Sequence, residues 1–313
     1  MSAPSVANAV TEFSNILERL HGSLRDEFCK KVEEIISETA QDEAKEDKIL
    51  RCIAEKIRQH PNVPVSAVVN TETVIHPSVG EFSDLDPSTV VSLDNFLYED
   101  DDAIDDLCEQ GLISRNFCLD CGSHKTAPLN FISHSASLLQ LKFVFQHALP
   151  DLRGKTLVDV GSRLGVVLYG AYYYSSAKAI IGVEINQQLC SIQNDMIKEF
   201  QLDDRVQVLC ADVCTKRSLL EKGDVIVLHN VFEFFAAEEV QIKIWKFLRE
   251  VLQTKGMLLV TVPSLAESLQ HLQTDIDLDS WVRQIPLDYT DFVLPNEEDR
   301  DQLERICLYE VIG

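Results

Sequence analysis

Five short apolar segments that alternate with helical patterns constrain the fold of this chain more than any other feature. They read LVDV, AIIGVEI, VQVLCA, DVIVLHN and MLLVTV, in that order along the chain. Between them, apolar residues recur at helical spacing over residues 165–176, 187–200 and 237–252. Strands that alternate with helices in this way form a parallel sheet covered on both faces. With RICLYEVI as the last strand, the sequence predicts a doubly wound, mostly parallel, seven-stranded α/β sheet.

The chain before residue 131 has a different pattern. Over residues 8–60, apolar side chains recur at spacings of three and four, which predicts helices. Residues 65–106 mix short apolar pieces with turns and end in the acidic run YEDDDAIDD. We therefore expect a mainly helical, partly irregular N-terminal region, residues 1–130, followed by the α/β domain, residues 131–313.

Acids and glycines stand at the ends of the predicted strands, where a doubly wound sheet binds its ligand. The first strand contains Asp159 and continues into a tight turn at Gly161, while Gly165 lets the next helix pack closely. Glu184 ends the second strand and can accept both hydroxyls of a ribose. Asp212 follows the third strand and can accept the amino group of an adenine. The sequence therefore predicts a nucleoside site at this edge of the sheet.

The loop between the first strand and its helix differs from that of a dinucleotide-binding fold. There, G-x-G-x-x-G cradles a pyrophosphate on an open helix N-terminus. Here Arg163 fills the middle of the loop and Asp159 precedes it. A carboxylate beside the loop disfavours phosphate and suits a ligand with an ammonium and a sulfonium group, such as S-adenosylmethionine. We expect Arg163 to be an exposed turn residue; the alternative is that it pairs with an acid near the ligand.

Four motifs in this order, DVGSRLG, GVE, CAD and HNVFEFF, resemble those of the class I S-adenosylmethionine-dependent methyltransferases, which have a Rossmann-like fold. The resemblance covers about residues 130–265. It implies that the two loop glycines lie along the methionine part of the cofactor and that Glu184 contacts the ribose and Asp212 the adenine. It also implies that Asp159 holds the loop or the amino group. We assign to the cofactor site Asp159, Gly161, Ser162, Arg163, Gly165, Glu184, Asp212 and Asn230.

One branch of that superfamily, the non-SET histone-lysine methyltransferases, is similar in three motifs: a D-x-G-S-x-x-G loop, a G-V-E strand and Asn-Asn-Phe-x-Phe. Asn230 matches the second asparagine of the last motif, whereas His229 and Val231 replace the first asparagine and the first phenylalanine. A lysine acceptor must lose a proton, since its free pKa is about 10.4. A carboxylate or histidine nearby could help, so Glu233, His229 and Asn230 are our catalytic candidates.

The aromatic residues of HNVFEFF have two interpretations. Phe232, Phe234 and Phe235 could line an alkylammonium channel by cation–π contact. We expect them instead to be core residues at the start of the next helix. The chain has no Asn/Asp-Pro-Pro-aromatic signature, and this argues against N-methylation of a nucleobase.

A second candidate site lies in NFCLDCGSHKT. Cys118 and Cys121 have the spacing of one zinc knuckle, and Cys108, His124 or His134 could supply the missing ligands. No second Cys-x-x-Cys follows, so the alternative is that these thiols pack beneath the α/β domain. Zinc is therefore a possible second cofactor.

The formal net charge of −23 bears on the partner. An acidic surface repels phosphate backbones, which disfavours nucleic acid, and it favours a basic protein. Nine scattered cysteines are typical of a reducing compartment, so we expect the cytosol or the nucleus. The chain has no apolar run of about 20 residues that would span a membrane, and its N-terminus lacks the pattern of a secretory signal.

The leading hypothesis is a methyltransferase that acts on a protein side chain, preferably a lysine, with the N-terminal region recognising or covering the substrate. Three alternatives stay open. The chain could methylate a small molecule, or RNA, although its charge disfavours the latter. It could also be a catalytically silent binding subunit, for which Arg163 in the glycine loop is the best support. The sequence does not indicate an oligomeric state.

Overall fold

The structure is a computed structural model of the chain. It describes residues 44–75, 83–99, 101–118, 126–289, 292 and 297–313, together with 13, 15–17, 19–22, 24–25 and 28–32.

The chain forms two compact units. The smaller comprises Met1–Ile49 and Asp288–Val293, and the larger comprises Leu50–Leu287 and Leu294–Gly313. The described residues between 13 and 32 are mostly helical, as predicted. The larger unit holds the sheet and also residues 50–130, and the predicted functional boundary at residue 130 stays a prediction.

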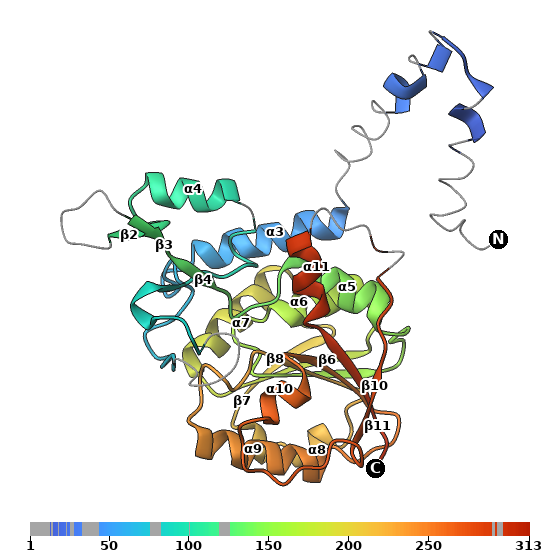
Figure 1. Ribbon diagram of the computed structural model, residues 1–313. Helices are drawn as coiled ribbons and strands as arrows, with labels where there is room; N and C mark the ends of the chain where they lie inside the picture. Colours follow the sequence, from blue (N-terminus) through green and yellow to red (C-terminus); the bar gives the residue numbers. More distant parts are fainter. Residues whose placement is uncertain are drawn as a thin grey trace. The chain divides into compact units, whose positions relative to one another are not determined.

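A seven-stranded sheet forms the centre of the larger unit, in the order β10-β11-β9-β8-β5-β6-β7 (Figure 1). All neighbouring strands from β5 to β9 run parallel, and β11 is antiparallel to both β9 and β10. The predicted mostly parallel seven-stranded sheet is therefore confirmed. Its strands are β5 (Thr156–Val160), β6 (Ala179–Glu184), β7 (Val206–Cys210), β8 (Val225–His229), β9 (Leu258–Val262), β10 (Val282–Ile285) and β11 (Cys307–Val311).

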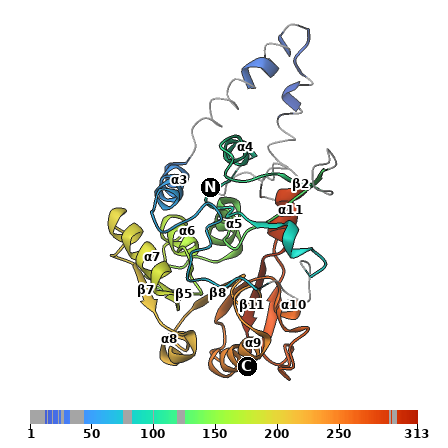
Figure 2. The same ribbon diagram turned by 90° about the vertical axis from the view of Figure 1, so that its left-hand side faces the viewer.

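Helices cover both faces of this sheet, which explains why its central strands are apolar along their whole length. In Figures 1 and 2, α5, α6 and α7 lie on one face and α8 and α9 on the other. These helices are α5 (Leu138–Phe143), α6 (Val166–Tyr174), α7 (Gln187–Glu199), α8 (Arg217–Leu220), α9 (Glu238–Val251), α10 (Leu265–Leu269) and α11 (Glu297–Glu304). A π-helical turn, Val144–Ala148, follows α5, and a 3-10 turn, Val213–Thr215, follows β7.

The strand order reverses at β5, which pairs with β6 on one side and with β8 on the other. The chain crosses from β5 to β6 through α6 and later returns to β8, so the loops after β5 and β8 diverge to opposite faces. Such a switch point leaves a crevice at the carboxyl ends of the strands. The predicted strand-end residues lie around this crevice.

The described part of the first 130 residues contains helices and short strands. The helix α3 (Lys45–Arg58) buries Leu50, Ile53 and Ile57 completely. Four very short strands form two pairs that the sequence did not predict. These elements are the 3-10 turn Pro87–Thr89, β1 (Val90–Ser92) paired with β4 (Asn130–Ile132), α4 (Asp101–Glu109), and β2 (Asn116–Cys118) paired with β3 (Thr126–Pro128).

Two tryptophans fix the packing beneath the sheet. Trp245 of α9 is 2% exposed, and its ring meets Phe232 edge-on at a centroid distance of 5.4 Å. Trp281 is fully buried, and its indole N–H donates to the carbonyl of Leu252 at 2.8 Å. Within the described residues, no helix has both the length and the apolar character needed to cross a bilayer.

Candidate functional site

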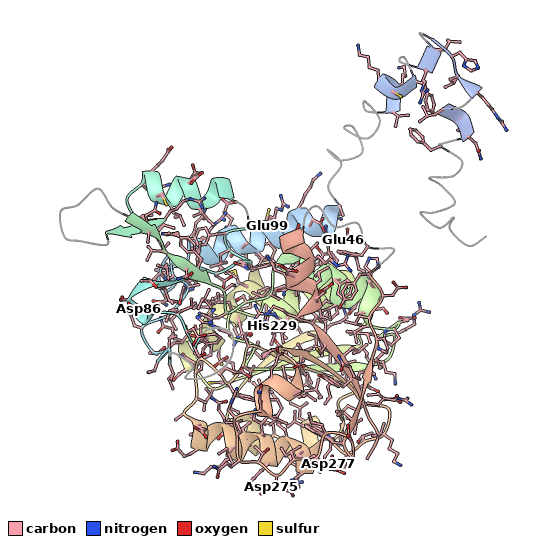
Figure 3. The ribbon with its side chains drawn as sticks, viewed as in Figure 1. Glu46, Asp86, Glu99, His229, Asp275 and Asp277 are labelled. Atoms are coloured by element: carbon pink, nitrogen blue, oxygen red, sulfur yellow. The ribbon has the colours of Figure 1, made fainter. Side chains whose placement is uncertain are left out.

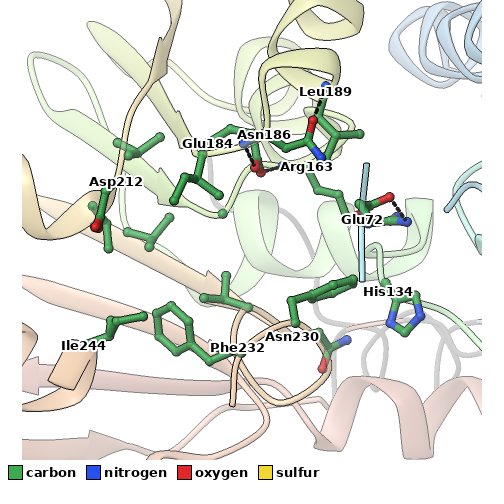
Figure 4. Close-up of a pocket in the computed structure, with 18 of the residues that line it drawn as sticks. Glu72, His134, Arg163, Glu184, Asn186, Leu189, Asp212, Asn230, Phe232 and Ile244 are labelled. Carbon is green, nitrogen blue, oxygen red and sulfur yellow. Dashed lines mark hydrogen bonds and ion pairs between the residues drawn. The ribbon is translucent and has the colours of Figure 1, made fainter. Parts of the chain in front are cut away.

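A cavity of about 290 Å³ opens at the carboxyl ends of β5, β6 and β8. Figure 4 shows Asp212, Glu184, Arg163 and Glu72 along one side of it, with Phe232, Asn230 and His134 opposite. We call the part around Asp212 and Glu184 the adenosine end, and the part around Asn230 and His134 the acceptor end.

The glycine turn after β5 has the geometry that the sequence predicts. Gly161 has a φ of +70°, and a Cβ on it would lie 2.6 Å from Cγ2 of Val231. Gly165 has a φ of +84°, and a Cβ there would lie 2.6 Å from the hydroxyl oxygen of Tyr169. Both conformations lie in the left-handed region, which favours glycine. Gly161 lines the cavity, whereas Gly165 faces the helices behind it.

Glu184 sits at the end of β6 and lines the adenosine end of the cavity. Its side chain is held by two backbone N–H groups: Oε2 accepts from Arg163 at 2.9 Å and Oε1 accepts from Asn186 at 2.8 Å. Burial raises its pKa, and these two donors act in the opposite direction. Each carboxylate oxygen can still accept a further hydrogen bond.

Asp212 is exposed at the lip of the cavity. Its Oδ1 accepts from the backbone N–H of Cys214 at 2.8 Å and caps the turn after β7. Its carboxylate lies at the cavity and can accept a further hydrogen bond. The structure therefore brings Asp212 and Glu184, from neighbouring strand ends, to the same cavity.

Asp159 and Ser162 do not line the cavity, although the sequence places them in the cofactor loop. Asp159 is 2% exposed, and burial, followed by the charge of Glu184, raises its pKa well above the ordinary value. Its buried place fits a role in holding the loop better than one in contacting a ligand. Ser162 donates through Oγ to Gln193 of α7 at 2.8 Å and so ties the loop to the helix behind it.

The expectation that Arg163 is an exposed turn residue is wrong. It has a φ of +48° and is 8% exposed. Its Nε donates to Glu72 at 2.9 Å, and its Nη1 donates to Asp94 at 3.3 Å. Its Nη2 donates to the carbonyl of Ala67 at 2.6 Å and to Glu72 at 3.4 Å. The alternative interpretation, pairing with acids near the ligand, is the one that the structure supports.

Glu72 belongs to an irregular segment, Asn62–Ile75, that we call the strap. Thr71, Glu72 and Thr73 of the strap line the cavity. Within the strap, Thr71 accepts from Nδ2 of Asn186 at 2.8 Å, and at its last residue the N–H of Ile75 donates to the carbonyl of Phe234 at 2.6 Å. The strap thus runs from the β6–α7 turn to the segment after β8, over the edge of the sheet. Sequence reasoning missed it, since no local motif marks it.

The three catalytic candidates after β8 are separated by the structure. Asn230, with a φ of +48°, and His229 line the cavity. Burial lowers the pKa of His229 to about 4, and its Nε2 has no hydrogen-bond partner among the described residues. Glu233 does not line the cavity; its Oε1 accepts from the hydroxyl of Ser268 at 2.8 Å. The structure therefore brings His229 and Asn230, but not Glu233, to the cavity, and their catalytic roles stay a prediction.

The three phenylalanines of HNVFEFF differ in their burial and in whether they line the cavity. Phe232 and Phe234 are 6% and 5% exposed, which confirms the prediction that they are core residues. Phe232 also forms part of the cavity wall. Phe235 lines the cavity as well, and Cζ of Arg163 lies 5.7 Å from its ring centre. In this structure Phe235 therefore has a cation–π contact with the guanidinium of Arg163.

His134 is a cavity residue that the sequence indicated only as a possible zinc ligand. It lies between β4 and α5 and is 6% exposed. Its Nε2 lies 3.3 Å from Oγ of Ser92, and its Nδ1 has no hydrogen-bond partner among the described residues. Burial, together with the charge of Arg163, lowers its pKa to about 3. No signal in ISHSAS would have placed it at the cavity.

The predicted zinc site falls largely on parts of the chain that are not described. Cys121 and His124 lie outside the described residues, as does the side chain of Cys118, and Cys108 lies on α4. Among the described side chains, no group of three or more histidines, cysteines, aspartates and glutamates could hold a metal ion. Zinc stays a prediction.

The strand order, the antiparallel β10–β11 edge and the cavity at the switch point together define the fold of this protein. The chain has the fold of the class I S-adenosylmethionine-dependent methyltransferases. Its glycine turn, Glu184 and Asp212 occupy the positions at strand ends that the motifs predict.

No protein-family model matches this chain, and neither does any curated protein. Solved structures similar to it include an RNA methyltransferase from Salinibacter ruber in complex with S-adenosyl-L-homocysteine, at 18% identity over 56% of this chain and 90% of that one, with a TM-score of 0.35. An O-methyltransferase from Bacillus cereus, at 14% identity, matches over 58% of this chain and 84% of its own, with a TM-score of 0.38. PKMT2 from Rickettsia typhi, at 22% identity, matches over 39% of this chain and 24% of its own, with a TM-score of 0.32.

Proposed function

We propose that this protein is an S-adenosylmethionine-dependent methyltransferase that acts on an amino group of a basic protein, preferably a lysine. The observation that carries the proposal is the pair of acids, Glu184 and Asp212, at neighbouring strand ends around one cavity. Such a pair suits the ribose and the adenine of a nucleoside.

The glycine turn supports a ligand without phosphate. Phosphates bind at a helix N-terminus through free backbone N–H groups. In this turn, the N–H groups of Gly161 and Ser162 donate to the carbonyl of Val183, and that of Gly165 donates to the carbonyl of Ser162. The N–H of Arg163 donates to Glu184. The amides of the turn itself, at Gly161, Ser162, Arg163 and Gly165, are therefore already bonded.

The residues present fit the cofactor. Glu184 has acceptor capacity left for the ribose hydroxyls, and Asp212 has acceptor capacity left for the adenine amino group. Ile185, 71% exposed, and Leu189 offer apolar surface beside them for the adenine ring. When bound, S-adenosylmethionine supplies a methyl group on a positively charged sulfur. The protein then needs mainly to hold the acceptor in line with that group.

The charge of the molecule supports a basic partner. Acidic side chains such as Asp86, Asp275 and Asp277 are exposed on the larger unit, whereas His229 lies in its interior (Figure 3). With a net charge of −23, the protein attracts a basic chain and repels nucleic acid. A lysine that is buried at the acceptor end has its pKa lowered by desolvation, which favours the neutral, nucleophilic amine. The cysteine content supports a reducing compartment, the cytosol or the nucleus.

Calorimetric titration with S-adenosylmethionine tests the cofactor assignment. We expect the wild type to bind and Glu184→Gln to bind about ten- to a hundredfold more weakly, because it loses a charged acceptor of the ribose. Glu199→Gln is the matched control, since Glu199 is exposed at the far end of α7, where it pairs with Lys56 at 2.8 Å. A wild type without affinity, or equal affinities for all three proteins, would refute the assignment.

Methyl transfer itself is tested with labelled donor and fractionated cell extract. Label in protein, released as methyl-lysine after hydrolysis, supports the proposal. Label in RNA or in small molecules would show that the acceptor is not a protein and would refute this part of the proposal. Binding without any label would identify a catalytically silent subunit.

A further inference from the structure

Two buried polar atoms of residues at the cavity have no partner among the described residues, Nε2 of His229 and Nδ1 of His134, and the second lies at the acceptor end. Nδ1 of His134 belongs to a side chain that is 6% exposed and lines the acceptor end, and no described residue hydrogen-bonds to it. A buried polar atom without a partner costs stability, so one that belongs to a cavity wall is a candidate for a hydrogen bond to a ligand.

The ring of His134 is held on three sides. Phe234 and Phe235 meet it edge-on, with ring centres 4.9 and 5.1 Å away. Its Nε2 lies within hydrogen-bond distance of the hydroxyl of Ser92, at 3.3 Å. These contacts fix the direction of the ring, so that Nδ1 is presented by a rigid group. A rigid hydrogen-bonding group is what the orientation of a reacting atom requires.

The imidazole is neutral at physiological pH, because burial and the Arg163 guanidinium lower its pKa to about 3. A neutral imidazole has one N–H and one lone pair. If the N–H is on Nε2 and faces Ser92, the lone pair of Nδ1 is directed away from Ser92. A group of such low basicity does not hold a proton taken from an ammonium, but it accepts a hydrogen bond.

We infer that His134 positions the methyl acceptor: its Nδ1 accepts a hydrogen bond from an N–H of an uncharged amine at the acceptor end. The inference rests on the proposed function and deepens it, since it specifies a neutral amine as the reacting form. The bond from the acceptor nitrogen to the methyl carbon forms as the carbon–sulfur bond breaks, and the electron pair of that bond stays on sulfur. The product ammonium then loses its extra proton to water, because His134 does not retain it.

Two cofactor analogues give a test that needs no substrate. S-adenosylhomocysteine has no methyl group on its sulfur. Sinefungin carries an amino group in the place of the transferred methyl group, and this amino group extends towards the acceptor end. We expect the wild type to prefer sinefungin, and we expect His134→Gln to lose about tenfold of that preference, the effect of one hydrogen bond to a charged group. Affinity for S-adenosylhomocysteine should stay unchanged in the variant.

Two further variants separate positioning from packing. Glutamine places its amide near Nε2 and keeps the contact with Ser92, whereas asparagine places its amide near Nδ1. His134→Asn should therefore retain most of the sinefungin preference that His134→Gln loses. His271→Gln, at an exposed position outside the cavity, is the matched control and should behave as the wild type.

A measurement on the wild type covers the case in which the variants fold poorly. The ring ¹⁵N resonance of Nδ1 of His134 should shift when sinefungin binds and stay in place when S-adenosylhomocysteine binds. If both analogues bind but neither the preference nor the resonance depends on His134, this inference alone is refuted. If neither analogue binds the wild type, the proposed function fails and the inference fails with it.

Discussion

The two ends of the cavity are built in different ways. The adenosine end consists of short turns that directly follow neighbouring strands, and each of its acids accepts at least one hydrogen bond from an amide close to it in sequence. Glu184 is bonded by Asn186 two residues later, and Asp212 by Cys214 two residues later. The acceptor end instead combines the strap, His134 and the segment after β8. The comparison shows that the adenosine end is formed largely by residues close together in the sequence. The acceptor end depends on contacts between residues that are far apart in the sequence.

Arg163 joins the two ends, and its removal should have the largest effect. Arg163→Ala leaves Glu72 and Asp94 buried without their cation, with side chains 6% and 1% exposed. We expect the free energy of unfolding to fall by about 3–5 kcal/mol, the usual cost of breaking a buried ion pair. Urea unfolding measures it.

Arg217→Ala is the matched control for that change. Arg217 also faces two carboxylates, Glu221 and Glu250, but its side chain is 44% exposed. Its loss should cost less than about 1 kcal/mol. Equal costs at the two arginines would mean that the strap is not held by Arg163.

Gly161→Ala probes the adenosine end. The substitution places a Cβ in the left-handed region, 2.6 Å from Val231, so both strain and overpacking oppose it. We expect a loss of about 2–4 kcal/mol, together with weaker binding of S-adenosylmethionine. Gly256→Ala shares the positive φ, at +84°, but its Cβ meets nothing within 4 Å, and it should cost only about 1 kcal/mol. Thermal and urea unfolding of both variants would show whether the close contact, rather than the turn, makes the difference.

His134 gives the acceptor end a pH dependence. Its pKa is about 3 in the folded protein, below the ordinary value of 6.5, so the unfolded chain binds more protons between these values. The stability that neutral His134 contributes is therefore present above pH 6.5 and is lost as the pH falls towards 3. Relative to His134→Asn, the wild type should lose up to about 1.4 kcal/mol per pH unit in this window. Urea unfolding of both proteins from pH 7.5 to 4.5 tests this; two parallel pH profiles would contradict it.

The smallest effect is expected at Glu233. Because its carboxylate accepts a hydrogen bond from Ser268 outside the cavity, Glu233→Gln should change kcat/KM by less than about twofold. Asn230→Ala, at the neighbouring cavity wall, should lower it much more. Labelled methyl transfer measures both. A large loss in Glu233→Gln would restore Glu233 as a catalytic base and would move the reacting region away from His134.

Much of the fold and half of the site could be predicted from sequence. The strands β5 to β9 and the helices between them follow from apolar runs and helical periodicity, which are local patterns. The edge strand β10, VRQI, was not predicted, because its exposed Arg283 and Gln284 hide the apolar signal of a buried strand. The catalytic candidates were judged by residue type alone, and side-chain direction then separated Asn230 from Glu233.

The sequence by itself determined the α/β sheet, the glycine turn and the acids at the strand ends, because each depends on residues that are neighbours in the chain. Only the tertiary structure decided the fate of Arg163, whose partners Glu72 and Asp94 are 91 and 69 residues away. It likewise decided the place of His134, which rests on Ser92 at a separation of 42 residues. Contacts over such separations are selected by packing and charge compensation in the folded chain, and no local pattern encodes them.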